Sequence, residues 1–102
     1  MRALGEFVEN VTVGPVFENS GTARSLVNVL RRTHPSMSVT DEGSYLRILV
    51  KNKCILRKDL VEKELGAPFH LPQDLEAIMP AFKGTFTVTD SLAVWSHHDE
   101  SL

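Results

Sequence analysis

Four histidines are the first side chains in this sequence that could do chemistry, because imidazole is a common metal ligand and proton carrier. No two of them have the i, i+4 spacing of a helical zinc site, and no Glu-x-x-His motif of a di-iron carboxylate protein occurs. They lie at a helix end, in a loop and in the C-terminal tail: His34, His70, His97 and His98. The sequence therefore predicts surface histidines and no metal site.

Cys54 is the next candidate, since a thiolate can act as a nucleophile. It lies beside Ile55 and Leu56 in an apolar run, which favours a buried structural thiol. The sequence contains no Gly-x-Ser-x-Gly elbow and no glycine-rich phosphate loop. Phe86 and Trp95 could stack on nucleic-acid bases, but their alternation with polar residues predicts core positions. We therefore predict no catalytic residue and no cofactor.

The composition predicts one small globular domain. The chain has 102 residues, of which 42% are hydrophobic, and its 11 basic and 13 acidic residues give a formal net charge of -2. This balance provides no electrostatic reason to bind nucleic acid or an anionic membrane. A single cysteine excludes an internal disulfide and fits a reducing cytoplasm, and no apolar run reaches the roughly 20 residues of a membrane helix.

The first half of the chain has the pattern of strand, helix, strand, strand. A strand from Val11 to Phe17 is interrupted by Gly14-Pro15, which predicts an edge position or a bulge, since proline cannot donate to a central ladder. A helix is expected from Gly21 or Thr22 to His34, with Asn19 or Ser20 as its N-cap. Its apolar residues recur at i, i+3, i+4 and i+7: Ala23, Leu26, Val27 and Leu30.

Two β segments and a helix follow. Residues 37–41 and 45–50 alternate around a turn at Asp41–Ser44, which predicts a hairpin, and Cys54–Leu56 predicts a further short strand. The next helix is expected from Lys58 to Leu65, with Arg57 as a poor N-cap because its side chain cannot accept a hydrogen bond.

The segment 65–84 sets the boundaries of the last elements. Gly66 can end one helix in the left-handed conformation, Pro72 fits the first turn of the next, and Pro80 is expected to stop that second helix. Leu75, Ile78 and Met79 should then share one helical face. A closing β-hairpin is expected from residues 85–89 and 92–95.

This order predicts a single compact α+β domain, β-α-β-β followed by two short helices and a β-hairpin, with mainly antiparallel sheet. We expect residues 1–10 to form a flexible N-terminal arm, residues 11–96 the domain, and residues 97–102 a polar C-terminal tail.

Three segments in this order resemble a known protein family: Val13–Phe17, Val39–Ile48 and Leu65–Phe69. The chain is similar, from about Asn10 to Trp95, to the effector or coupling proteins of bacterial multicomponent di-iron monooxygenases, which oxidise toluene, phenol, propane or methane. The sequence departs from the family at Arg57, where a hydroxyl residue often caps the helix. The short arm places the chain nearer the toluene, phenol or propane branches than the methane branch.

The resemblance implies a compact α+β domain with two small sheets, and a cytoplasmic regulatory component that is not an enzyme and carries no cofactor or metal. Such a protein docks on a separate di-iron hydroxylase and tunes substrate and oxygen access and electron coupling during hydrocarbon hydroxylation. It shares part of that surface with a ferredoxin or reductase, and alone it is a monomer or weak dimer.

We expect the hydroxylase-binding residues to come from the arm and first strand, from the helix-cap loop and from the corner before the last hairpin. They are Asn10, Gly14, Phe17, Asn19, Ser20, Gly21, Thr22, Met79, Phe82 and Lys83. For Gly14 and its neighbour Pro15, local folding is an equally good explanation, and Met79 and Phe82 could instead belong to the core.

An alternative function is a small-molecule-sensing regulatory domain that self-associates, because a β-α-β-β start also suits modules that bind metabolites between subunits. Such a domain would show a thermal shift with its metabolite.

Overall fold

The computed structural model describes residues 11–97 and confirms the predicted α+β class. The elements of this part of the chain, in order, are β1 (Thr12–Glu18), α2 (Gly21–Thr33), β2 (Ser38–Asp41), β3 (Tyr45–Lys51), β4 (Lys53–Arg57), α3 (Lys58–Leu65), α4 (Gln73–Glu76), β5 (Ala81–Lys83), β6 (Thr85–Val88) and β7 (Leu92–Ser96). The expected arm and tail lie outside the described residues, apart from His97.

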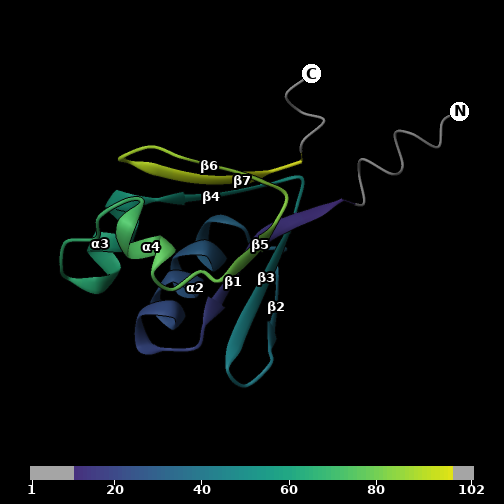
Figure 1. Ribbon diagram of the computed structural model, residues 1–102, viewed down its shortest axis with the longest axis horizontal. Coiled ribbons are helices and arrows are strands. Elements are labelled where there is room, and N and C mark those ends of the chain that lie inside the picture. Colours follow the sequence, from purple (N-terminus) through teal and green to yellow (C-terminus); the bar gives the residue numbers. More distant parts are fainter. Residues whose placement is uncertain (1–10, 98–102) are drawn as a thin grey trace, which may run out of the picture.

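The strands form two small antiparallel sheets, with the orders β2-β3-β1-β5 and β4-β7-β6. Figure 1 shows the three-stranded sheet across the top of the molecule and the four-stranded sheet running steeply down from it, with α2, α3 and α4 beside them. The helices bury the apolar face of each sheet and leave the other face uncovered in the described part of the chain.

β1 is a central strand, so the predicted edge position is wrong. The ladder with β3 skips Gly14 and Pro15, but its register is the same on both sides of them, from Thr12 opposite Lys51 to Glu18 opposite Tyr45. No extra residue is inserted, so the predicted bulge is absent. On its other side β1 pairs with β5, a short strand that was not predicted from the sequence. Proline is tolerated here because the ladder between β1 and β3 is interrupted at Gly14 and Pro15, where proline has no N–H to donate.

Helix α2 begins where the sequence predicts. Ser20 is the N-cap: it is extended, and its Oγ accepts a hydrogen bond from the Ala23 N–H at 3.1 Å. The helix ends at Thr33, one residue before His34 and two before Pro35. The predicted apolar stripe is buried against the sheets, together with Val29.

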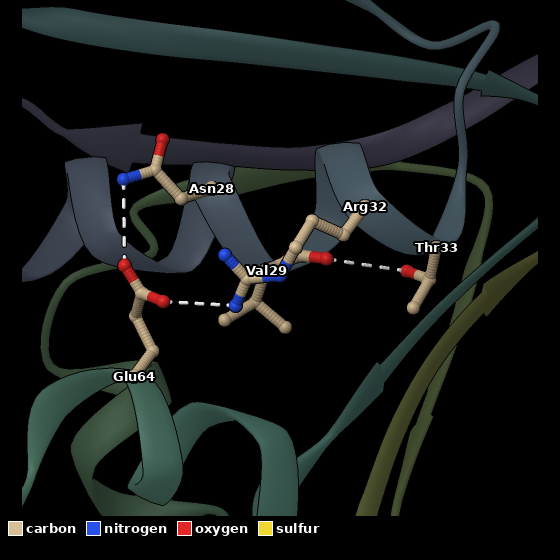
Figure 2. Close-up of polar contacts among 5 residues, drawn as sticks. All are labelled: Asn28, Val29, Arg32, Thr33 and Glu64. Atoms are coloured by element: carbon tan, nitrogen blue, oxygen red, sulfur yellow. Dashed lines mark hydrogen bonds and ion pairs between the residues drawn. The ribbon is translucent and has the colours of Figure 1, made fainter.

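Helix α3 and Gly66 also match the prediction. Gly66 ends α3 in the left-handed conformation, with φ 68°, and Arg57 provides no side-chain cap. A polar clamp joins α3 to α2 (Figure 2): Glu64 Oε1 lies 2.8 Å from Arg32 Nη2, and Glu64 Oε2 accepts from Asn28 Nδ2 at 3.5 Å. These contacts link the two helices directly on their exposed side.

Helix α4 is shorter than expected. It ends at Glu76, so Ile78 and Met79 lie beyond it and Pro80 is not the residue that stops it. Pro72 is its N-cap, one position before the predicted first turn. Four residues are too few to propagate a helix, and the short element serves to bury Leu75.

Two sharp corners connect the sheets. Asn52 joins β3 to β4 with φ 66°, and Gly84 joins β5 to β6 with φ 107°. The backbone carbonyl of Asn52 accepts a hydrogen bond from the His97 N–H at 3.0 Å, and the backbone N–H of Asn52 donates one to the Val11 carbonyl at 3.0 Å. The chain thus passes from one sheet to the other twice at neighbouring points, where Val11, Asn52 and His97 meet.

The core lies between the helices and the inner faces of both sheets. Its largest fully buried side chains are Trp95, Phe17, Leu26, Leu30, Ile48, Leu56 and Leu75. The alternation predicted for β3 is correct, since Leu46, Ile48 and Val50 face this core. The predicted core position of Trp95 is confirmed as well.

Candidate docking surface

A surface groove of about 310 Å³ lies on the uncovered face of the four-stranded sheet. It is formed by residues of β1, β3 and β5 and of the turns that precede them: Val16, Glu42, Tyr45, Arg47, Pro80, Ala81 and Phe82. Most of its lining residues are apolar, and Tyr45 and Phe82 are two of the large hydrophobic residues that the fold leaves exposed, at 42% and 46%. Exposed aromatic side chains beside a hollow are typical of protein-binding surfaces.

The pairing of β1 with β5 explains how the groove forms. Residue 81 lies directly opposite Val16, and Arg47 lies opposite Val16 on the other side, so the three side chains share the outer face. The same pairing brings Gly14 next to Lys83 and Pro15 next to Phe82. Two parts of the predicted docking site, about 70 positions apart in the sequence, are therefore neighbours.

Charged groups line the groove and lie near it on β5. Arg47 Nε lies 3.5 Å from Glu42 Oε2, and both side chains are a little over two-fifths exposed. Lys83 Nζ donates to Thr12 Oγ1 at 3.1 Å. Exposed pairs of this kind contribute little to folding stability, so exchanging them for contacts with a partner costs the domain little.

The helix-cap loop adjoins the same end of the sheet. Asn19 Nδ2 donates to the Gly43 carbonyl at 2.9 Å, and the Asn19 N–H donates to the Ser44 carbonyl at 2.8 Å. Arg24 Nη1 in turn donates to Asn19 Oδ1 at 2.7 Å. These bonds fix the loop against the β2–β3 turn, which contributes Glu42 to the groove.

An aromatic stack supports the Phe82 ring from behind. The Phe82 and Phe86 ring centroids are 5.4 Å apart, and the Phe86 and Trp95 centroids are 5.2 Å apart. Trp95 is fully buried, so the stack connects the exposed ring to the core. Such support holds an exposed aromatic side chain in one place and lowers the entropy that binding would cost.

The structure places the predicted docking residues in three different environments. Gly21, Thr22, Phe82 and Lys83 are exposed, and Asn19, Ser20 and Met79 are half-buried. Gly14 and Phe17 are buried, and Asn10 lies outside the described residues. Phe17 has no exposed surface at all, so its side chain cannot touch a partner in this conformation, and its position belongs to the core.

Gly14 has a structural role of its own. Its φ is 153°, and a Cβ at this position would lie only 2.3 Å from the Ile48 carbonyl oxygen. Glycine is therefore required for β1 to pair closely with β3. Local folding explains this residue without a partner, as one of the two alternatives anticipated.

Tyr45 and Arg47 line the groove but were not among the predicted docking residues. Their signal was present, because the alternation of β3 assigns them to the face opposite Leu46 and Ile48. What the sequence could not supply was β5, whose pairing closes the groove on its other side.

Two of the candidates for chemistry, His34 and Cys54, have structural contacts. His34 Nδ1 contacts the Leu30 carbonyl at 3.0 Å, and its Nε2 accepts from the Ile55 N–H at 3.2 Å. Cys54 is buried, and this burial raises its pKa to about 12, which keeps it a thiol. Among residues 11–97, no three metal-ligating side chains come together, and no helix is long and apolar enough to cross a membrane.

The fold and the groove define a small α+β domain that presents a supported aromatic surface beside charged groups. A model of the MmoB/DmpM family matches residues 11–96, and the chain belongs to this family. The family predicted from the sequence is therefore confirmed.

Solved structures share the fold. Chains from two structures of the phenol hydroxylase–regulatory protein complex match with TM-scores of 0.77 and 0.73, each at 16% identity over 84% of this chain, and they are covered to 98% and 99%. The soluble methane monooxygenase regulatory protein B matches with a TM-score of 0.64 at 19% identity. That match covers 83% of this chain and 64% of the other.

Proposed function

We propose that this protein is a non-catalytic effector that docks on the di-iron hydroxylase of a multicomponent monooxygenase. Membership of the MmoB/DmpM family over residues 11–96 carries the proposal. Two chains of the same fold come from complexes of a regulatory protein with phenol hydroxylase, which supports a hydroxylase as the partner. The protein supplies a surface, and the hydroxylase supplies the iron and the reaction.

The groove is the part of the surface best suited to dock. Phe82 is exposed yet held by Phe86, which suits a central apolar anchor, while Arg47 and Lys83 provide charge at the rim. The cap loop Asn19–Thr22 extends this surface beyond the β2–β3 turn. A specific interface of standard size buries about 1,600 Å² in total, which requires the groove together with these flanking segments.

An effector acts by binding one state of its partner more tightly than another. Coupling free energies of about 1–3 kcal/mol are typical, which corresponds to a 5- to 150-fold change in affinity between states. In the hydroxylase, the favoured state has altered access for substrate and oxygen and better coupling of electron delivery to oxidation. Docking has to be reversible, because a ferredoxin or reductase uses part of the same surface.

The function is tested by reconstitution. The rate of hydrocarbon oxidation and the product formed per NADH consumed are measured with and without this protein. We expect both to rise when the protein is added. An unchanged rate together with an unchanged product yield would overturn the proposal.

The docking surface is tested by a matched pair of substitutions. Phe82→Ala removes the proposed anchor, and Leu92→Ala removes an exposed apolar side chain of the other sheet, at 37% exposure. Loss of an anchor of this kind costs at least about 2 kcal/mol, or roughly 30-fold in hydroxylase affinity. Leu92→Ala should leave the affinity unchanged, and Arg47→Glu, which leaves the aromatic stack intact, should weaken it. Equal affinities for all variants would place docking elsewhere.

A further inference from the structure

Four strands of the described domain have an unpaired side, and they differ in how that side is protected. Edge strands normally carry charges, kinks or covering groups that prevent them from pairing with another chain. β2 carries Asp41, β4 carries Lys53 and Arg57, and β5 carries Lys83 and is three residues long. β6 (Thr85–Val88) has none of these features.

The contrast with β4 is instructive. The Ile55 N–H in the middle of β4 points away from β7 and donates to His34 Nε2 at 3.2 Å, so a side chain from the end of α2 closes that edge. No hydrogen bond within residues 11–97 reaches the corresponding groups of β6.

The groups left open on β6 can be identified from its pairing. The Thr89 N–H donates to the Leu92 carbonyl at 2.8 Å, and the register with β7 continues through Thr87 opposite Val94. Because hydrogen-bonded and non-hydrogen-bonded pairs alternate in antiparallel sheet, Thr87 and Thr85 bond to β7. The N–H and carbonyl groups of Phe86 and Val88 therefore point to the open side.

We propose that the β6 edge pairs with the same edge of a second copy of this chain, antiparallel about a two-fold axis at Thr87. In this register Phe86 lies opposite the second copy's Val88, and the two residues exchange both backbone hydrogen bonds. The two-fold axis repeats this exchange, and the two sheets join into one of six strands.

The side chains fit this register. Thr87 lies opposite Thr87 of the second copy in a non-hydrogen-bonded pair. Side chains are closest in such pairs, and threonine pairs are favourable there. Phe86 and Val88 lie on the core side in both copies, so the two apolar faces stay on the same side of the joined sheet. No charge repels, because Thr85–Val88 carries none.

The outer face of the joined sheet is continuous as well. Ile55 lies opposite Val94, and Val94 lies opposite Thr87, so these three residues form one row across the three-stranded sheet. Ile55 is 36% exposed. Pairing at Thr87 joins this row to the same row of the second copy. The Thr87 end of each row is then buried between the two copies.

Edge pairing over four residues is a small interface. Stable dimers bury about 1,200 Å² or more, so this association is weak and depends on concentration. It involves neither Tyr45 nor Arg47, which line the groove on the other sheet. Its failure would therefore leave the proposed docking on a hydroxylase untouched.

The experiment is sedimentation equilibrium of the isolated protein over a concentration series up to about 1 mM, where interactions near −4 kcal/mol become visible. Thr87→Lys and Thr87→Asp each place like charges face to face on the axis, and each should weaken self-association at least about tenfold. An equimolar mixture of the two variants should restore it, because opposite charges then meet.

Thr85→Lys is the matched control. It puts the same charge on the same strand and the same exposed face, but in the proposed register it faces the second copy's Thr89. Thr85→Lys should therefore change the dissociation constant for self-association by no more than about twofold, because the two lysines lie well apart. A mass of one chain at every concentration would overturn the proposal, and so would a dimer that Thr87→Lys leaves intact.

Discussion

Gly84→Ala is the substitution for which the structure gives the most definite expectation. Gly84 is the corner between β5 and β6, and its φ of 107° is a conformation that side-chain-bearing residues rarely adopt. A Cβ at this position would lie 2.8 Å from the Ser96 carbonyl oxygen and 2.8 Å from Val13 Cγ1. Both neighbours belong to strands, so neither can move away without disturbing a sheet.

The expected loss of stability has two parts. The positive φ costs an alanine about 1–2 kcal/mol, and forcing a methyl group into a packed site costs about 1–3 kcal/mol. Gly84→Ala should therefore lower the free energy of unfolding by about 2–5 kcal/mol. At about 1 kcal/mol for every 4–8 °C in a domain of this size, the midpoint of thermal unfolding should fall by at least about 8 °C.

Gly43→Ala separates the two parts. Gly43 also has a positive φ, 84°, but a Cβ there would meet nothing within 4 Å. This variant should show only the conformational part, about 1–2 kcal/mol. Urea unfolding of both variants gives the comparison. If Gly84→Ala proves no more destabilising than Gly43→Ala, the two strands are not packed at the corner as described.

Three further outcomes are expected from the same fold. Ser20→Ala removes the N-cap of α2 and should cost about 1 kcal/mol by urea unfolding. Arg32 holds the pKa of Glu64 below its usual value, so this carboxylate stabilises the fold above the ordinary glutamate pKa of about 4.3, and the benefit disappears as the pH falls through the lowered value. Glu64→Gln should flatten the pH dependence of unfolding in that range. The Cys54 thiol should react with a disulfide reagent only on unfolding, and rapid reaction in the native state would contradict its burial.

Local signals in the sequence determined much of the fold. Ser20, Gly66 and the apolar stripe of α2 act within a few residues of one another, so their effects could be predicted without knowing the tertiary structure. The alternation of β3 was equally clear, because one face of that strand is buried and the other is not.

The errors arose where distant segments meet. β5 has only three residues, and it is a strand because β1 lies beside it. β1 shows no alternation, since five consecutive residues from Val13 to Phe17 are buried, and this concealed both its central position and the burial of Phe17. The groove depends on these same two strands, so the sequence could mark Phe82 and Lys83 as candidates for docking but not identify the residues that surround them.

The corner at Gly84 has a consequence for regulation. β5 and β6 are one run of chain, and the rings of Phe82 and Phe86 touch across the corner. A partner bound in the groove would contact β5, and a partner bound at the open edge would contact β6. The two partners would therefore act on adjacent parts of the same segment of chain. Thermodynamic reciprocity then requires that whatever factor a hydroxylase imposes on self-association, self-association imposes on hydroxylase affinity.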